Sequence, residues 1–223
     1  MNWSKIVTSI LLRIGGAFFT NWTKIKILFR GKKIAVLGPR SSGKTTLLQF
    51  LVTGELPREY IQTGKPEKLS GRMYKLEDLE LIIKDTLDVP GDKLSHTEWE
   101  RLCQEADIVC YLVDASKLHK ADQDYQKNAQ EDVRHIRAWH QARKSAPPKF
   151  CLVATHCDLI PDYSSLPRDR KADFSDEFWK KDSLQRIINL GGGSGYVKCV
   201  LGSLKDRTNT EILVGNIFNE VTI

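Results

Sequence analysis

The chain has 223 residues, of which 41% are hydrophobic and 28% are charged, and this suits one well-filled core with an extension rather than two domains. Its five cysteines are odd in number and most lie in apolar runs, so we expect reduced thiols and a cytosol-facing protein, not a disulfide scaffold. The net charge is +6, but residues 1–33 contain basic residues and no acidic one. The rest of the chain is close to neutral, which gives no indication of a nucleic-acid-binding body.

Residues 1–31 are predicted to form a basic amphipathic helical arm. Apolar residues recur there at steps of three and four, and the pair Gly15 and Gly16 favours a kink or two short helices over one rod. A membrane-spanning helix is the least favoured interpretation, because its window of about 20 residues would have to include Arg13. Basic residues beside aromatic ones favour contact with the anionic face of a membrane, while packing on a partner or on the domain itself stays open.

The next segment combines a strand-like run, Ile34 to Leu37, with the letters GPRSSGKT and an apolar helical pattern. This is a complete P-loop signature in its strand-to-helix context. Glycines allow the backbone amides to turn toward phosphates, and the helix that follows presents its positive end. Lys44 is expected to neutralise the β and γ phosphates, and the Thr45 hydroxyl to bind Mg²⁺. The predicted phosphate-binding residues are Gly38, Arg40, Ser41, Ser42, Gly43, Lys44, Thr45 and Thr46.

Two later segments are expected to complete the metal site. The letters DVPG follow an apolar strand, and this D-x-x-G arrangement would direct the carboxylate of Asp88 to Mg²⁺ and the amide of Gly91 to the γ phosphate. Asp85 lies nearer the end of the apolar run and stays an alternative to Asp88. The polar segment between the two motifs is broken by proline and glycine, which predicts a mobile loop, and its Thr63 could give Mg²⁺ a second hydroxyl.

Beyond these motifs, strand-like and helical patterns alternate to the end of the chain. Such alternation predicts a parallel sheet with helices on both faces, with ligands bound at the carboxyl ends of the strands. The expected strands are 106–116, 149–160 and 195–205, and the expected helices are 119–144, 176–190 and 209–223.

The order of motifs resembles that of the Ras-like small GTPases, with GPRSSGKT, a threonine-bearing loop, DVPG, THCD and the loop LGSLK. The resemblance covers residues 32–223. It implies an α/β fold of the P-loop NTPase class, a Ras-like G domain whose central, mostly parallel sheet is flanked by helices. It also implies that GTP or GDP is bound together with Mg²⁺.

The letters THCD stand where this family usually has N-K-x-D, and they are similar to the T-H-x-D version found in Roc GTPase domains. The resemblance implies that Asp158 accepts hydrogen bonds from guanine, with Thr155 and His156 in place of the asparagine and lysine. It implies further that a backbone amide at Ser203 or Leu204 meets guanine O6. These five residues are the predicted base-binding residues.

Two departures from the family pattern bear on catalysis. Asp92 stands after DVPG, where many Ras-like enzymes have the glutamine that orients the attacking water, so we expect slow hydrolysis. His96 lies close by and is an alternative for that role. Arg40 occupies a P-loop position that is usually small, and it could either reach phosphate or point outward to a partner. With Lys44, these three are the candidate catalytic residues.

The predicted function is a GTP-binding molecular switch that hydrolyses GTP slowly and uses its arm to engage a membrane surface or an effector. Effector or regulatory proteins are expected partners, and the expected location is the cytoplasm, including the cytoplasmic face of a membrane. A non-catalytic GTP-binding scaffold, or pseudo-GTPase, is the alternative that Asp92 and Arg40 motivate. An ATP-dependent kinase or ATPase is the third hypothesis.

Overall fold

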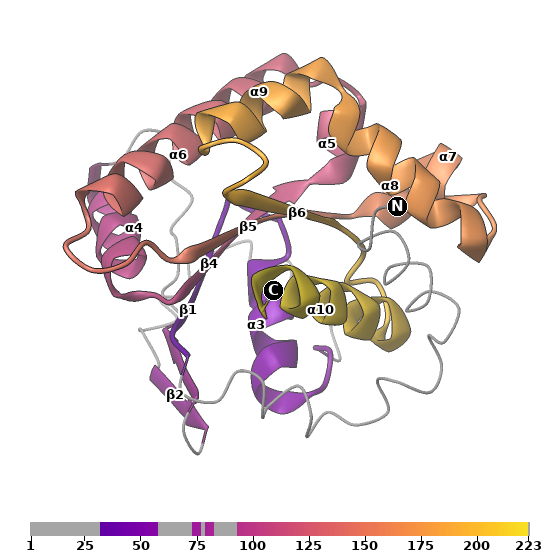
Figure 1. Cartoon of the computed structure of the whole chain (residues 1–223). Coiled ribbons are helices and arrows are strands. Elements are labelled where there is room, and N and C mark those ends of the chain that lie inside the picture. The colour runs from indigo at the N-terminus through magenta and orange to yellow at the C-terminus, as the bar shows by residue number, and fades with distance from the viewer. Residues whose placement is uncertain (1–31, 58–72, 77–78, 83–92, 223) are drawn as a thin grey trace.

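The computed structural model describes residues 32–57, 73–76, 79–82 and 93–222, and these residues form a central sheet covered by helices on both faces (Figure 1). Six strands follow the order β2-β3-β1-β4-β5-β6. Only β2 and β3 pair antiparallel, while the other neighbours are parallel, so the predicted mostly parallel sheet is confirmed. The strands are β1 (Ile34–Leu37), β2 (Met73–Leu76), β3 (Leu79–Ile82), β4 (Ile108–Asp114), β5 (Lys149–Thr155) and β6 (Val197–Leu201).

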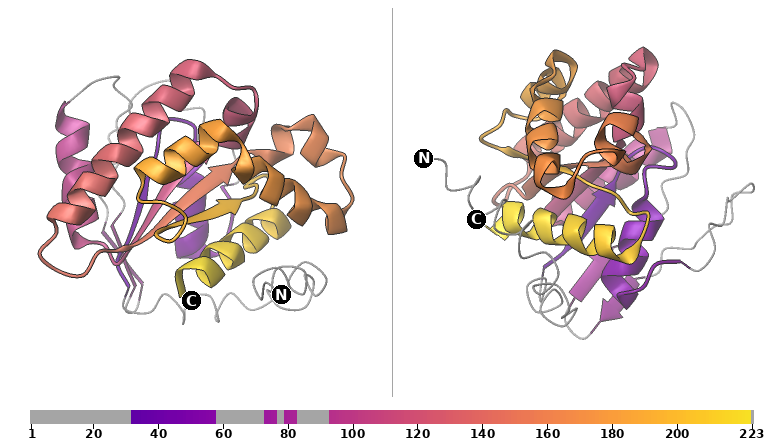
Figure 2. Two further views of the ribbon diagram at one scale, coloured as in Figure 1. Left: turned by 45° about the horizontal axis from the view of Figure 1, so that its top comes forward. Right: turned by 90° about the vertical axis from the view of Figure 1, so that its right-hand side faces the viewer.

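Helices divide between the two faces of the sheet, and α6 and α9 lie side by side on one of them (Figure 2). The helices that contribute to the core on that face are α4 (Lys93–Glu105), α5 (Ala115–His119), α6 (Gln123–Ala142), α8 (Lys171–Lys180) and α9 (Asp182–Leu190). The opposite face is covered by α3 (Lys44–Thr53) and α10 (Arg207–Thr222). Short elements after β5 are η1 (Cys157–Leu159), α7 (Pro161–Ser164) and η2 (Arg168–Arg170).

The sheet separates two apolar clusters, and alternate residues of each strand enter different ones. In β1, Ala35 and Leu37 join the cluster under α4, α6 and α9, whereas Ile34 and Val36 join the one under α3 and α10. All four are buried, which is why β1 reads as a continuous apolar run with no polar alternation.

Helix α6 is largely polar and packs against the core through one apolar stripe. Its buried residues are Ala129, Val133, Ile136 and His140, spaced by four, three and four. The Asp122 carboxylate caps the helix by accepting a hydrogen bond from the Tyr125 amide at 3.0 Å. The helix expected over 119–144 is therefore present in its central part, with α5 as a separate short helix before it.

The single helix expected over 176–190 is wrong, because the chain breaks there into α8 and α9. Lys181 separates them with extended backbone angles, φ −58° and ψ 135°. The break lets two differently oriented helices bury apolar side chains against the same core, Phe178 and Trp179 from α8 and Leu184, Ile187 and Ile188 from α9.

Parallel pairing brings the carboxyl ends of β1, β4, β5 and β6 to one edge of the sheet, and the P-loop and the loops with THCD and LGSLK begin there. The predictions for the arm 1–31 and for Thr63, Asp85, Asp88, Gly91 and Asp92 lie outside the described residues. His96 lies within α4, but its side chain is outside the described part. Among the helices that are described, none is long and apolar enough to cross a membrane.

Candidate functional site

The P-loop connects β1 to α3 through three residues with positive φ angles, Gly38 at 139°, Ser41 at 60° and Gly43 at 88°. The two glycines are also required by space. A Cβ atom on Gly38 would lie 2.3 Å from the Leu112 carbonyl oxygen, and one on Gly43 would lie 2.6 Å from Cδ1 of Leu204. The loop therefore packs directly on β4 on one side and on the LGSLK loop on the other.

The side chain of Lys44, at the end of the P-loop, bonds back to the residues at its start. Its Nζ atom donates hydrogen bonds of 2.7 Å to the carbonyl oxygens of both Gly38 and Pro39. Helix α3 begins at this lysine, has no acidic residue in its first turn and receives no side-chain cap from Gly43. A lysine ammonium beside a helix N-terminus without a side-chain cap is an electropositive arrangement suited to phosphate.

The hydroxyl-bearing residues of the P-loop differ in burial. Thr45 is exposed in the first turn of α3, whereas Ser42 is fully buried with its Oγ atom unbonded within the described structure. The Thr45 side chain is therefore accessible to a ligand or metal from outside. The Ser42 side chain lies under the loop, against Gly38.

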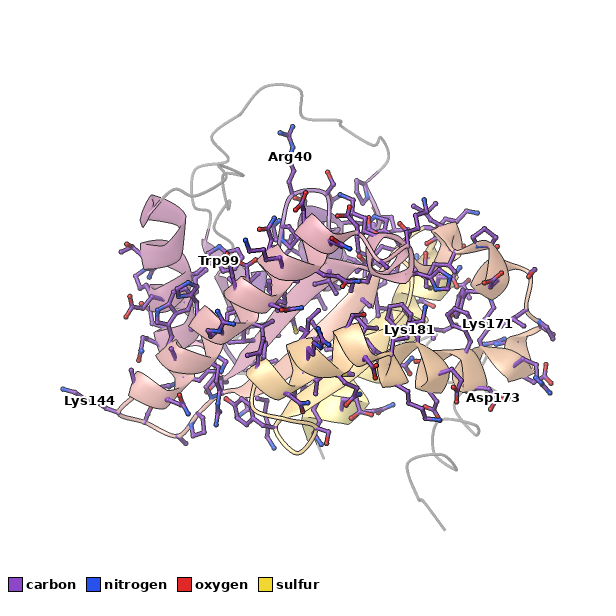
Figure 3. All side chains as sticks on the ribbon, turned by 90° about the horizontal axis from the view of Figure 1, so that it is seen from above. Arg40, Trp99, Lys144, Lys171, Asp173 and Lys181 are labelled. Carbon is purple, nitrogen blue, oxygen red and sulfur yellow. The ribbon has the colours of Figure 1, made fainter. Side chains whose placement is uncertain are left out.

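Arg40 is exposed at the tip of the P-loop, and Figure 3 shows its side chain extending away from the sheet. Contact with phosphate and contact with a partner both stay predictions for this residue.

The THCD segment continues β5 into η1, where Asp158 lies half-buried. The Ser203 hydroxyl donates a short hydrogen bond of 2.5 Å to Oδ1 of Asp158 and accepts one of 3.0 Å from the Lys205 amide. Backbone bonds join the same two loops, since the Gly202 amide donates to the Ala154 carbonyl at 2.9 Å. The aspartate predicted to read guanine is thus held by the loop predicted to meet guanine O6.

Thr155 is fully buried, so its side chain supports the site from below instead of facing a ligand. Its Oγ1 atom lies 2.9 Å from the Ser42 carbonyl oxygen and 3.1 Å from that of Val113. His156 follows in the left-handed conformation, with φ 59° and ψ 27°, and its Nδ1 atom lies 2.9 Å from the same Thr155 oxygen. The predicted base-reading loop is therefore joined to the P-loop through the Thr155 side chain, a residue that the sequence predicts to contact the base directly.

Sequence reasoning missed two features of this edge. The sequence suggested a role only for the backbone amide of Ser203, whereas its side chain also orients Asp158. The second feature is that Leu204 packs over Gly43. No local pattern could reveal these contacts, because the partners are far apart in the sequence.

Asp114 ends β4 at this edge, but its carboxylate is used as a helix cap. It accepts hydrogen bonds from the Ser116 amide at 2.8 Å, from the Ser116 hydroxyl at 2.7 Å and from the Lys117 amide at 3.2 Å. These bonds begin α5 and direct the carboxylate to that helix.

Cys157, the variable position of THCD, is buried beside Asp158. Burial raises the pKa of its thiol to about 12, so the thiol is protonated at neutral pH and is not a nucleophile. Cys151 is buried in β5, where burial likewise raises its thiol pKa. These two cysteines pack in the apolar clusters on the two faces of the sheet.

No family model matches the chain, but curated proteins and solved structures resemble it. ADP-ribosylation factor-like protein 8c of Arabidopsis thaliana is 26% identical over 96 residues, which are 43% of this chain and 49% of that protein. ADP-ribosylation factor-like protein 8d of the same plant is 29% identical over 84 residues, 38% of this chain and 44% of that protein. The chain thus spans about half the length of the curated relatives it matches.

A solved structure extends the likeness to nearly the whole chain. It is the ADP-ribosylation factor-like GTP-binding protein, small COPII coat GTPase SAR1, from Encephalitozoon cuniculi in complex with GDP. The TM-score is 0.56 at 17% identity, over 99% of this chain and 92% of that one. The chain has the fold of the Ras-like small GTPases, and the resemblance to that family predicted from its motifs is confirmed.

Proposed function

We propose that the chain is a GTP-binding molecular switch that hydrolyses GTP slowly to GDP and phosphate in the presence of Mg²⁺. One observation carries this proposal. Three loops from distant parts of the sequence are joined directly at the carboxyl edge of the sheet, through the contacts of Thr155 with Ser42, Leu204 with Gly43 and Ser203 with Asp158. The likeness to ADP-ribosylation factor-like proteins, and to a GTPase whose structure contains GDP, supports the same function.

Guanine selection is assigned to Asp158. Guanine presents two adjacent donors, N1–H and the 2-amino group, and a carboxylate offers acceptors for both while still accepting from Ser203. Adenine lacks this pair of donors, so an ATP-dependent enzyme would have no use for the aspartate. His156 and the amides of Ser203 and Leu204 complete the proposed base site.

The test of this assignment is nucleotide affinity measured by calorimetry for GDP, ADP and xanthosine diphosphate. Asp158→Asn exchanges one acceptor for a donor, so GDP affinity is expected to fall about 100-fold and xanthosine diphosphate affinity to rise. Asp173→Asn, which changes an exposed carboxylate on α8, is the matched control and should leave GDP affinity unchanged. Equal binding of ADP and GDP by the unaltered protein would support the kinase or ATPase hypothesis instead.

Phosphate and metal binding are assigned to the P-loop. The exposed Thr45 hydroxyl, in the first turn of α3 beside Lys44, fits an oxygen ligand of Mg²⁺. Thr63 and Asp88, with Asp85 as the alternative carboxylate, are the proposed ligands outside the described residues. Bound Mg²⁺ would neutralise charge on the β and γ phosphates. Lys44 and the loop amides, with the Gly91 amide, would stabilise the charge that develops as water attacks the γ phosphate.

Slow hydrolysis is proposed from Asp92, because a carboxylate in the water-orienting position repels the γ phosphate. His96 stays the alternative group for orienting water. Single-turnover loss of bound GTP, followed by chromatography, tests the activity. A rate that Lys44→Ala abolishes supports the enzyme, and no turnover above background with or without cell extract overturns it.

The second candidate function is a non-catalytic GTP-binding scaffold. Asp92 in the water-orienting position and the exposed Arg40 at the P-loop tip motivate it. In that case GTP binds tightly and persists, and Arg40→Ala weakens partner capture. The nucleotide that co-purifies with the protein separates the two functions, because a scaffold retains GTP and an active enzyme retains mainly GDP.

The arm, residues 1–31, is proposed to engage an anionic membrane surface or an effector when the bound nucleotide changes. Its basic residues and apolar face support this proposal. Sedimentation with vesicles containing phosphatidylserine, in the GDP state and with a GTP analogue, provides the test. Equal binding in both states contradicts a nucleotide-dependent arm.

A further inference from the structure

The Thr155 hydroxyl has three polar neighbours in a fully buried position. These are the carbonyl oxygens of Ser42 at 2.9 Å and Val113 at 3.1 Å, and the Nδ1 atom of His156 at 2.9 Å. A hydroxyl has one hydrogen atom to donate and two lone pairs that accept. Thr155 therefore cannot donate to all three neighbours.

The two carbonyl oxygens can only accept, so the hydrogen of the threonine must lie on their side. If the hydroxyl hydrogen pointed to His156, Oγ1 would face two buried carbonyl oxygens with no hydrogen atom between them. Such contacts between oxygen atoms are repulsive. His156 must then donate from Nδ1. We propose that Thr155 is a positioning residue of the nucleotide site, which fixes the His156 ring in its Nδ1–H tautomer and orients the P-loop peptide between Ser42 and Gly43. The inference rests on the proposed guanine-nucleotide binding and deepens it.

The first consequence concerns phosphate. In a trans peptide the C=O and N–H bonds point in opposite directions, and the described chain contains no cis peptide bond. Thr155 holds the Ser42 carbonyl toward β5, so the amide of Gly43 in the same peptide points away from β5. Gly43 is one of the residues whose amides cradle phosphate in a P-loop. A side chain from the base-reading strand thereby orients a phosphate-binding amide.

The second consequence concerns the base. A non-glycine residue in the left-handed conformation is uncommon, and His156 adopts it with φ 59°. The hydrogen bond from Nδ1 to Thr155 helps to hold this conformation and leaves the lone pair on Nε2. Where a lysine would offer a charge and three donors, His156 offers a neutral ring face and one acceptor. This combination suits a stacked base and a hydroxyl donor such as that of ribose.

The same chain provides a histidine of the opposite kind. Nδ1 of His119 lies 3.0 Å from Nζ of Lys181, and an ammonium group can only donate. His119 must therefore accept at Nδ1 and bear its proton on Nε2, which lies 3.7 Å from Oδ2 of Asp162. His119 is the internal control for the tautomer of His156.

Nuclear magnetic resonance of the full chain labelled with ¹⁵N-histidine tests the inference without any ligand. Long-range ¹H–¹⁵N correlations, recorded at about pH 8, distinguish the two tautomers. We expect Nδ1–H for His156 and Nε2–H for His119. In Thr155→Val, which keeps the side-chain shape, His156 should change to Nε2–H, and in Thr155→Ser it should not. An Nε2–H tautomer of His156 in the unaltered protein overturns the proposal.

Affinity provides the second measurement, with GDP and guanosine as the probes. Thr155→Val should weaken GDP binding about tenfold or more, and Thr155→Ser should restore it to within about threefold. Guanosine, which has no phosphate to meet Gly43, should lose less than GDP. Equal losses for both ligands overturn the link to the P-loop.

The two proposals fail in different ways. If the unaltered protein binds no guanine nucleotide, the proposed function fails, while the His156 tautomer still decides the inference. If Thr155→Val does not fold, as circular dichroism would show, the tautomers of the unaltered protein and of Thr155→Ser decide it.

Discussion

The two ends of the sheet use polar side chains in opposite ways. At the carboxyl ends, Thr155 and Ser203 join separate loops, and α3 receives no side-chain cap from Gly43. At the amino ends, Arg143 donates through Nη1 to the carbonyl oxygens of Cys103 and Ala106, at the end of α4. At the carboxyl ends side chains thus join separate loops beside the start of α3, and at the amino ends a side chain closes the end of a helix.

Two histidines, His156 and His140, also differ between the two ends of the sheet. His156, at the carboxyl edge, is partly exposed on a left-handed backbone. His140, on α6, is only 2% exposed, lies edge-on to Phe150, and has Nδ1 3.0 Å from the Tyr196 hydroxyl. The Tyr196 hydroxyl also donates to the Pro148 carbonyl, just before β5 begins. This residue type thus supports proposed ligand recognition at one end and packing at the other.

The largest expected effect is the loss of nucleotide binding in Lys44→Ala. The substitution removes the ammonium group that bonds to Gly38 and Pro39 and would neutralise phosphate. GDP affinity measured by calorimetry should fall about 100-fold or more, because charged hydrogen bonds are the strong ones. Lys144→Ala, at an exposed position after α6, is the matched control (Figure 3). Unchanged GDP affinity in Lys44→Ala would show that the carboxyl end does not bind phosphate.

At the carboxyl ends of the strands, the sequence predicted those parts of the site that consist of contiguous motifs. The P-loop between β1 and α3 and the strand ending in THCD are contiguous patterns with fixed physical requirements, such as glycine at Gly38 and Gly43. The joins between loops were not predictable, because Thr155 and Ser42 are separated by 113 positions and Ser203 and Asp158 by 45.

Fold prediction had the same limit. Alternating apolar patterns were enough for strands β1, β4, β5 and β6 and for a mostly parallel sheet, but they did not predict α4 or the antiparallel strand β2. The break at Lys181 has no local signal, since lysine is a good helix former, and only packing of α8 and α9 against a common core explains it.

A pair of glycine substitutions compares the two ends by stability. Gly38→Ala places a Cβ atom 2.3 Å from the Leu112 carbonyl oxygen at φ 139°, whereas Gly193→Ala, before β6, meets nothing within 4 Å at φ 83°. The first should lower the free energy of unfolding by about 3 kcal/mol, from strain plus overlap, and the second by about 1 kcal/mol from strain alone. Urea unfolding followed by circular dichroism measures both. Equal losses would mean that the P-loop backbone relaxes away from β4.

Acid should destabilise the amino end through His140. Burial and the nearby Arg137 and Arg143 lower its pKa from 6.5 to about 4, so the unfolded chain binds more protons between these values. Stability is therefore complete above about pH 6.5 and falls as the pH drops toward 4, by about 2 kcal/mol between pH 7 and pH 5.

The difference in urea unfolding between the unaltered protein and His140→Gln, measured at both pH values, isolates this contribution. His135→Gln, at an exposed position on the same helix, is the control. A pH dependence that His140→Gln leaves unchanged would assign the acid sensitivity to other groups.

The smallest expected effect is that of Tyr196→Phe. The substitution keeps the ring on which the Arg137 guanidinium lies, 4.4 Å from its centroid, and removes only the hydroxyl between His140 and Pro148. Loss of one such bond should lower the free energy of unfolding by about 1 kcal/mol. GDP affinity should not change, because the hydroxyl lies at the amino ends of the strands and the P-loop at their carboxyl ends. A change in GDP affinity equal to that of Thr155→Val would show that the two ends are coupled. It would contradict the assignment of nucleotide binding to the carboxyl ends and of packing to the amino ends.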